Sequence, residues 1–282
     1  MGHRWTAAQS VIGVAVLAAV AGCAIPSGAP QAPPVCAHAD LPTLYPQIFT
    51  FGTDQPAYPP WYIGDNPTNG EGFEAAVAYA VADRLGYPPE QVRWVRIPFN
   101  TAMAPGPKPF DADLSQFSIT DQRREVVDFS APYYDVAQAV VALRHSPAAA
   151  ATGQDDLRPL RIGAQVGTTS SGAARAVGAV EPVIVYDTNA DAKRALADGQ
   201  IDALVLDLPT AVTIQAELAD SVIVGQLPTT GEPAEQLGMV LDKDSALTAC
   251  VSQAVEELRD DGVLDDLERR WLSDGQRPRK LS

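Results

Sequence analysis

Arg123 follows a short run of small polar residues, and this spacing suits a side chain that holds a carboxylate. Ser118 and Thr120 precede it in the segment SITDQRR. A guanidinium is a planar donor that can bind both oxygens of a carboxylate, whereas lysine offers a point charge. The alternative is structural: Arg123 could cap a helix or pair with Glu125 or Asp128.

A second candidate anion site lies in the segment VGTTSSG, residues 166–172. Gly167 allows the chain to turn after a strand, and Thr168 and Thr169 open a helix whose first N–H groups can bind an anion. The spacing of Gly167 and Gly172 also resembles a phosphate loop, but alanine follows where such a loop needs lysine. The structural alternative is ordinary helix capping by a threonine or serine.

Asp207 supplies the opposite charge. It ends the apolar segment IDALVLD and precedes Leu208 and Pro209. Its carboxylate could accept hydrogen bonds from an ammonium group, or it could cap the helix that Pro209 opens. Together with Arg123 and the helix N–H groups it would form a dipolar site. A free α-amino acid requires such a site, because both of its charges need partners once they are buried.

The elements that must position these residues alternate along the chain. Strands are expected at residues 47–54, 91–99, 110–120, 137–145, 160–166, 182–187, 201–207 and 235–245. Helices are expected at residues 71–86, 168–180, 188–199 (with Asn189 as a possible cap and Gly199 as the stop), 209–220, 247–258 and 264–271, and the tail 273–282 is expected to be frayed. This alternation indicates α/β architecture with mostly parallel sheets, in which ligands bind beyond the carboxyl ends of strands.

The N-terminus resembles a targeting segment. Arg4 precedes an apolar run at residues 11–21, which is too short to span a bilayer. The sequence VAGC then resembles the lipobox of bacterial lipoproteins, which implies a signal peptide at residues 1–22 and lipid on Cys23. The alternative is an ordinary secretory signal with a chance cysteine. Residues 23–39, rich in Pro and Ala, are expected to form a tether.

The remaining cysteines and the charge limit the classes of function. Cys36 and Cys250 form no C-x-x-C motif, and the three histidines do not cluster, so no metal site is expected. The two cysteines form either a disulfide, as thiols outside the cytoplasm tend to do, or two separate buried thiols. The net charge of −15 argues against nucleic acid as a partner.

Five segments in order resemble the extracellular solute-binding proteins, family 3, of ABC importers for polar amino acids. They are GTDQPAYPPW, EGFEAAVAYAVADRLG, FSITDQRREVVDFSAPYY, RIGAQVGTTSSG and DGQIDALVLD, and the resemblance covers residues 46–273. It implies the type II periplasmic-binding-protein fold, with two α/β lobes joined by two crossover strands. The first lobe would comprise residues 40–135 and 239–275, the second residues 136–238, and the tail residues 276–282.

The resemblance also implies a role for particular residues. Arg123 would hold the ligand α-carboxylate, helped by Ser118 and the backbone at Gln116, and Asp207 would take the α-ammonium. The other implied ligand-binding residues are Asp54, Tyr58, Phe99, Gln165, Thr168 and Thr169. Trp61 would lie either at the rim or in the core beside the hinge.

Two departures from the family pattern affect the expected pocket. Glu74 replaces the usual Asp of the helix motif, and Gln116 stands where glycine or serine is common, which could narrow the pocket. Gln165 is neutral, which mildly favours an uncharged polar ligand side chain.

The expected function is capture of a polar amino acid by a monomeric lipoprotein anchored outside the cell membrane, with delivery to an ABC importer permease. No catalytic residues and no cofactor are expected. The first alternative is a sensor subunit that signals to a membrane partner. The second is an enzyme such as a dehydratase on the same scaffold, although the sequence contains no Ser/His/Asp or Cys/His set. Ligand turnover would identify the enzyme, and co-purification with a permease would separate the importer from the sensor.

Overall fold

The computed structural model describes residues 1–3, 36–228, 234–272 and 278–281. The chain divides into two units, residues 1–33 and residues 34–282, and the fold described below is that of the second unit. The expected lipidation site, Cys23, and most of the signal peptide and tether lie outside the described residues. Among the helices that the structure describes, none has the length and apolar character needed to cross a membrane.

The first lobe is built on a five-stranded mixed sheet. In spatial order its strands are β2 (Val92–Arg96), β1 (Phe49–Thr53), β3 (Ala112–Asp113), β12 (Val240–Leu241) and β4 (Asp128–Phe129). β1 pairs in parallel with β2 and β3, while β12 runs antiparallel to β3 and β4. The late strand β12 therefore returns to the first lobe.

The second lobe has its own five-stranded sheet. In spatial order its strands are β10 (Ser221–Gln226), β6 (Gln138–Leu143), β9 (Ala203–Asp207), β7 (Ile162–Gln165) and β8 (Ile184–Tyr186). β9, β7 and β8 are parallel, and β6 is antiparallel to β9 and β10. Two short antiparallel strands, β5 (Tyr134–Val136) and β11 (Glu235–Leu237), join the lobes.

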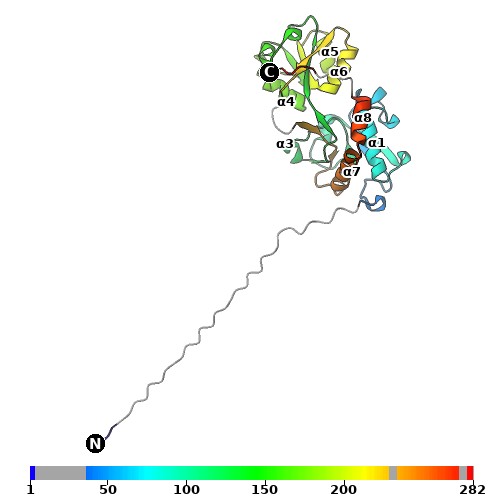
Figure 1. Cartoon of the computed structure of the whole chain (residues 1–282), viewed down its shortest axis with the longest axis vertical. Helices are drawn as coiled ribbons and strands as arrows, with labels where there is room; N and C mark the ends of the chain where they lie inside the picture. The colour runs from blue at the N-terminus through cyan, green and yellow to red at the C-terminus, as the bar shows by residue number, and fades with distance from the viewer. Residues whose placement is uncertain (4–35, 229–233, 273–277, 282) are drawn as a thin grey trace. The chain divides into compact units, whose positions relative to one another are not determined.

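Helices cover both sheets. In Figure 1, α1, α7 and α8 belong to the first lobe, and α4, α5 and α6 belong to the second. Their bounds, with those of the short helices, are α1 Phe73–Arg84, α2 Phe99–Ala102, α3 Asp121–Arg124, α4 Thr169–Ala176, α5 Asn189–Ala197, α6 Leu208–Glu217, α7 Thr248–Asp260 and α8 Val263–Trp271. Six 3-10 turns complete the described elements: His38–Asp40, Ile63–Asp65, Pro67–Asn69, Pro89–Gln91, Pro147–Ala150 and Gln154–Leu157.

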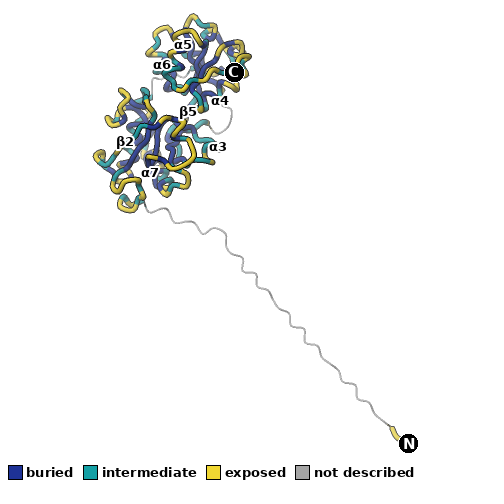
Figure 2. Tube along the Cα trace, turned by 180° about the vertical axis from the view of Figure 1, so that it is seen from behind, coloured by how far each residue is buried: buried dark blue, intermediate teal, exposed yellow. Residues whose placement is uncertain are grey.

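The expected apolar faces form the core. Phe73, Val77, Val81 and Leu85, spaced for one face of α1, are all buried, and they share a cluster with Phe49 and the apolar face of α7. Figure 2 shows the buried strands lying inside more exposed helices and turns. Burial of apolar side chains at helical and strand spacing therefore explains both lobes.

Three local expectations are corrected. Thr188, not Asn189, caps α5, because its hydroxyl accepts from the Asp191 N–H at 3.1 Å. The tether does not extend to residue 39, because residues 38–40 form a turn and the His38 ring lies 4.3 Å from the Tyr87 ring.

The third correction concerns the tail, of which residues 278–281 are not frayed. The Leu281 side chain is fully buried in the second lobe. The Gln226 N–H donates to the Arg279 carbonyl, and the Leu281 N–H donates back to the Gln226 carbonyl, each at 2.8 Å. Residues 278–281 thus extend the edge of β10, although a segment this short shows no helical or strand periodicity in the sequence.

Cys36 and Cys250 form a disulfide, with Sγ atoms 2.06 Å apart and a sequence separation of 214 residues. The bond ties the start of the folded unit to α7. In the chain-entropy account, closing so long a loop stabilises the folded state by about 5 kcal/mol, because it restricts the unfolded chain.

Candidate functional site

A polar cavity lies between the two lobes, and all ten residues that the sequence singled out for ligand binding line it. A concave site with several convergent polar groups is typical of small-molecule binding. The lining consists of Thr53, Asp54, Pro56, Ala57, Tyr58, Tyr62, Phe99, Ser115, Gln116, Ser118, Arg123, Gln165, Thr168, Thr169, Ser170, Asn189, Leu206 and Asp207.

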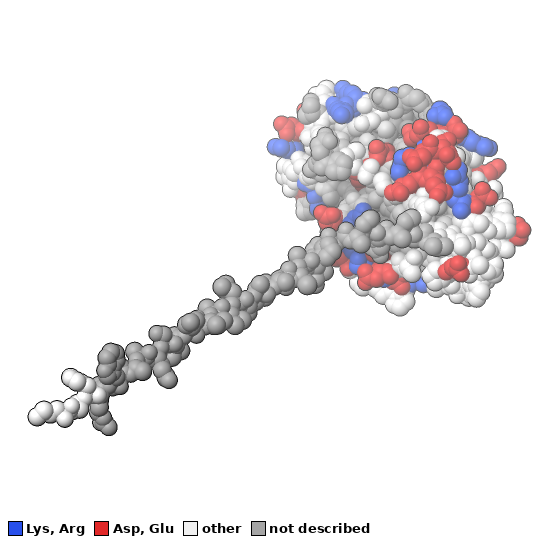
Figure 3. All heavy atoms as spheres, turned by 60° about the horizontal axis from the view of Figure 1, so that its bottom comes forward, with Lys and Arg blue, Asp and Glu red and all other residues white. Residues whose placement is uncertain are grey.

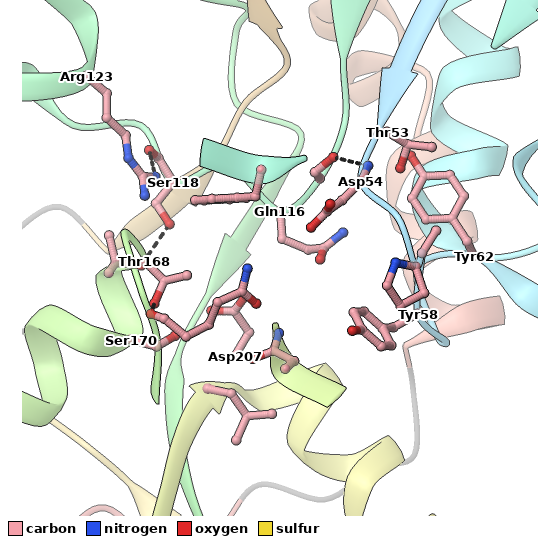
Figure 4. Close-up of a pocket in the computed structure, with 18 residues that line it drawn as sticks. Thr53, Asp54, Tyr58, Tyr62, Gln116, Ser118, Arg123, Thr168, Ser170 and Asp207 are labelled. Atoms are coloured by element: carbon pink, nitrogen blue, oxygen red, sulfur yellow. Dashed lines mark hydrogen bonds between the residues drawn. The ribbon is translucent and has the colours of Figure 1, made fainter. Parts of the chain in front are cut away.

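The lining side chains follow strand ends, as the α/β pattern predicts. Asp54 follows β1, Gln165 ends β7 and Asp207 ends β9. Figure 4 shows Arg123 and Ser118 at one side of the cavity, Asp54 and Tyr58 at the other, and Asp207 between them. The cavity therefore has a cationic end and an end that carries an acidic group.

Arg123 contacts both lobes. Its Nη1 donates to the Ser118 carbonyl at 2.7 Å, and its Nη2 donates to the Gly167 carbonyl of the second lobe at 3.0 Å. The guanidinium carbon lies 5.5 Å from the centre of the Phe99 ring. Burial lowers the pKa of Arg123, yet an arginine stays charged in proteins. The two carbonyl bonds hold the guanidinium in place while it retains further N–H donors for an anion.

Two of the structural alternatives for Arg123, pairing with Asp128 and capping a helix, are filled by other residues. Asp128 accepts from Lys243 Nζ at 3.1 Å and from the Thr248 hydroxyl at 2.9 Å. Thr120 is the N-cap of α3, because its hydroxyl accepts from the Arg123 N–H at 3.2 Å. The Arg123 side chain therefore does not cap this helix.

Thr168 has the capping role that was the alternative for this segment. Its hydroxyl accepts from the Ser171 N–H at 3.1 Å and donates to the Gln165 carbonyl at 2.7 Å, so its proton is already used. The N–H groups of Thr169 and Ser170, at the start of α4, have no acceptor among the described residues. These two backbone groups, near Arg123, can donate to an anion.

Asp207 is not a helix cap. It precedes α6, but its carboxylate makes no capping hydrogen bond and instead accepts from Gln138 Nε2 at 2.8 Å. The same Nε2 donates to Glu235 at 3.1 Å. Burial, and next the charge of Glu235, raise the pKa of Asp207 to about 7. A cation placed between these carboxylates would stabilise their ionised forms.

Asp54 and Tyr58 form the other end of the cavity. The Asp54 carboxylate accepts from the Gln55 N–H at 2.7 Å, and its own N–H donates to Ser115 Oγ at 2.9 Å. Burial raises the pKa of Asp54. The Tyr58 hydroxyl accepts from the Ala190 N–H of the second lobe at 3.2 Å.

Further hydrogen bonds cross between the lobes. The hydroxyls of Ser118 and Thr169 lie 3.0 Å apart. The Trp61 indole N–H donates to the Thr210 hydroxyl at 2.8 Å, and the Trp61 side chain is fully buried. Trp61 does not line the cavity, so of its two expected positions it has the one in the core beside the hinge.

Three residues that hold the site were not predicted from the sequence. Glu235 lies on the crossover strand β11 and accepts from Ser118 Oγ at 2.6 Å. Gln138 begins β6 and bridges Asp207 and Glu235. Glu74 lies behind Gln116. Only the departure of Glu74 from the family pattern gave a signal; Glu235 and Gln138 carry none in the sequence.

Acidic residues outnumber basic ones in the sequence, 35 to 20. On the face drawn in Figure 3, acidic side chains gather in clusters with fewer basic ones between them, in keeping with the net charge of −15. Among the residues that the structure describes, no group of three or more His, Cys, Asp or Glu is placed to hold a metal ion.

Comparisons with known proteins agree with this geometry. The sequence profile of the bacterial extracellular solute-binding proteins, family 3, matches residues 49–274. A probable histidine-binding protein of Campylobacter jejuni is 28% identical over 71% of this chain and 76% of its own length. The L-cystine-binding protein TcyJ of Escherichia coli is 25% identical over 94% of this chain and 95% of its own.

Solved structures have the same fold. A mutant of ArgBP from T. maritima superposes with a TM-score of 0.67 at 30% identity, covering 81% of this chain and 96% of that one. The ancestral amino-acid-binding protein AncCDT-1, described as a precursor of cyclohexadienyl dehydratase, gives a TM-score of 0.66 at 28% identity over 80% and 96% of the two chains. The fold is thus that of the type II periplasmic amino-acid-binding proteins.

Proposed function

Because the chain belongs to the bacterial extracellular solute-binding proteins of family 3, we propose that it captures a polar α-amino acid between its lobes for an ABC importer. The observation that carries the proposal is that Arg123 of the first lobe and Asp207 of the second line one polar cavity between the lobes. An α-carboxylate would bind the free N–H groups of Arg123 and of the α4 start. The α-ammonium would bind Asp207.

Lobe closure follows from this assignment. Arg123 belongs to the first lobe and Asp207 to the second, so one ligand would contact both lobes at once. A ligand that gains contacts only when the lobes meet stabilises the closed form. The relatives named above are a probable histidine-binding protein and an L-cystine-binding protein, and ArgBP has been solved bound to arginine, so we would screen amino acids with polar side chains.

A thermal-shift screen against the twenty amino acids tests the proposal. We expect one or a few polar amino acids to raise the melting temperature, because a ligand that binds only the folded state stabilises it by about 2.7 kcal/mol at a hundredfold excess over Kd. Sugars and polyamines serve as controls. A folded protein whose melting temperature responds to no amino acid would contradict the proposal.

The same samples separate the alternative functions. An importer receptor should release its ligand chemically unchanged. If the protein were a dehydratase, mass spectrometry would show that the recovered ligand had lost water. The enzyme alternative draws on Asp207, whose pKa of about 7 would suit a general acid or base. Co-purification with a permease, rather than with a membrane signalling protein, would separate the importer from the sensor.

We further propose that the protein is a monomer held at the outer face of the cell membrane by lipid on Cys23. The support is the VAGC sequence after a short apolar run. We expect Cys23→Ser to move the protein from the membrane fraction to the soluble fraction, because a single changed side chain removes the site of lipid attachment. Cys36→Ser is the matched control and should stay with the membrane. Membrane association that survives Cys23→Ser would overturn the anchor.

A further inference from the structure

A buried carboxylate lies behind the wall of the cavity at Gln116. Glu74, in the first turn of α1, is fully buried and does not line the cavity. Its Oε1 accepts from the Gln116 N–H at 2.7 Å and from the Tyr133 hydroxyl, and its Oε2 accepts from Gln116 Nε2. Both nitrogens of Gln116 are therefore bound to one side chain.

This clamp fixes the orientation of the Gln116 amide. An ionised carboxylate only accepts hydrogen bonds, so the NH2 group must face Glu74 and Oε1 must face elsewhere. Figure 4 shows the Gln116 amide at the cavity, beside Asp54 and Tyr58. Among the described residues, none donates a hydrogen bond to Gln116 Oε1.

The backbone of Gln116 is also held in an unusual conformation. Its φ angle is +54°, in the left-handed region that residues other than glycine rarely adopt. The bond from its N–H to Glu74 accompanies this conformation, so the clamp sets both the direction of the side chain and that of the backbone.

Gln165 provides a contrast within the same cavity. Its amide makes no hydrogen bond with any described side chain or backbone group, so it can turn to donate or to accept. Gln165 therefore adapts to either kind of ligand group, whereas the Gln116 amide has a fixed orientation, with its oxygen held away from Glu74.

The charged groups of the cavity also favour a cationic ligand side chain near Gln116. The titratable groups that line the cavity and carry formal charge are Asp54, Arg123 and Asp207. An α-carboxylate and an α-ammonium would pair with Arg123 and Asp207. Asp54, whose backbone carbonyl accepts from Arg96 Nη1 at 2.7 Å, would remain beside the acceptor of Gln116, where a cationic ligand group would stabilise its ionised form.

We propose that Glu74 is a positioning residue that sets the side-chain selectivity of the cavity. By holding the Gln116 oxygen toward the ligand, it favours a side chain that carries positive charge and only donates, such as a guanidinium or an ammonium. A neutral amide or urea of the same shape would place its own carbonyl against an acceptor. The inference rests on the proposed function, since it assumes an amino-acid ligand.

Arginine and citrulline form the matched pair of probes, because citrulline replaces one guanidinium nitrogen with a carbonyl oxygen. We expect the wild-type protein at pH 8 to bind arginine more tightly by calorimetry. Glu74→Gln can itself donate, which lets the Gln116 amide turn over, so the ratio of the two affinities should fall about tenfold, the effect of one hydrogen bond to a charged group. Glu74→Asp keeps an ionised acceptor and should keep the preference for arginine.

A double-mutant cycle separates positioning from a direct effect of charge. Gln116→Ala alone should lower the ratio, and adding Glu74→Gln to it should change the ratio no further. Gln165→Ala should weaken both ligands alike. The pH profile gives a second readout: burial raises the pKa of Glu74 to about 7, so the preference should weaken below pH 7.

The outcomes are distinguishable from a failure of the proposed function. If the folded protein binds no amino acid, the proposed function itself is contradicted. If the wild-type protein binds amino acids, but binds arginine no better than citrulline, the proposed function stands and the proposed selectivity is contradicted. An effect of Glu74→Gln that persists in the Gln116→Ala background overturns positioning through Gln116.

Discussion

Arg123→Ala is expected to abolish amino-acid binding at ordinary ligand concentrations. Removing one partner of a buried charge pair costs about 2–5 kcal/mol, which corresponds to a loss of affinity of roughly 30- to 5,000-fold. Arg123→Lys should be intermediate, because lysine keeps the charge but loses the planar fork. Isothermal titration with the ligand found in the thermal-shift screen measures the effect.

Arg124→Ala is the matched control, since it removes the neighbouring arginine of the same short helix. The Arg124 side chain is exposed, and its guanidinium carbon lies 5.7 Å from the Phe129 ring centre, away from the cavity lining. It should change the affinity by less than about threefold, as surface substitutions usually cost under about 0.5 kcal/mol. Equal losses in the two variants would show that Arg123 acts through the stability of α3, not through the ligand.

Ligand affinity is expected to fall as the pH drops below 7. Asp207 has a raised pKa of about 7 in the ligand-free protein, so it is ionised above this pH and increasingly protonated below it. An α-ammonium binds the ionised form and must displace the proton. Each pH unit below 7 should therefore lower the affinity by up to about tenfold from this group alone.

Calorimetry from pH 8 to pH 5.5 measures this dependence, with Asp207→Asn as its control. The asparagine keeps the oxygen that accepts from Gln138 but cannot ionise. It should bind more weakly at pH 8 and show a flatter profile, and any remaining slope would come from the other carboxyl groups with raised pKa values, Glu74 and Asp54. Wild-type affinity that is constant over this range would contradict the assignment of the ammonium to Asp207.

The stability of the ligand-free protein should change in the opposite direction. A carboxyl group with a raised pKa binds its proton more tightly in the folded state than in the unfolded state. Between about pH 4 and pH 7, Asp207 and Glu74 therefore make the folded state less stable as the pH rises. This opposite sign distinguishes a loss of affinity at low pH from simple acid unfolding.

The sequence by itself placed Gln165 and Asp207 at the ends of strands, but the strand expected at residues 110–120 is only Ala112–Asp113. Gln165 and Asp207 each end a strand whose apolar pattern is local, and such patterns require no knowledge of distant contacts. Arg123 instead lies in the short helix α3. Because the sheets carry parallel strands, their carboxyl ends gather at one edge, and the residues after them share one cavity. All ten singled-out residues accordingly line it.

Only the tertiary structure decided how these residues are held. Ser118 bonds to Glu235, 117 residues away on a crossover strand, and Gln116 bonds to Glu74, 42 residues away at a helix start. The buried tail at Leu281 belongs to the same class. Hydrophobic periodicity reports which face of an element is buried, but not which polar groups meet there. Polar partners are fixed only when packed elements bring buried donors and acceptors within hydrogen-bonding distance, where leaving either unpaired is costly.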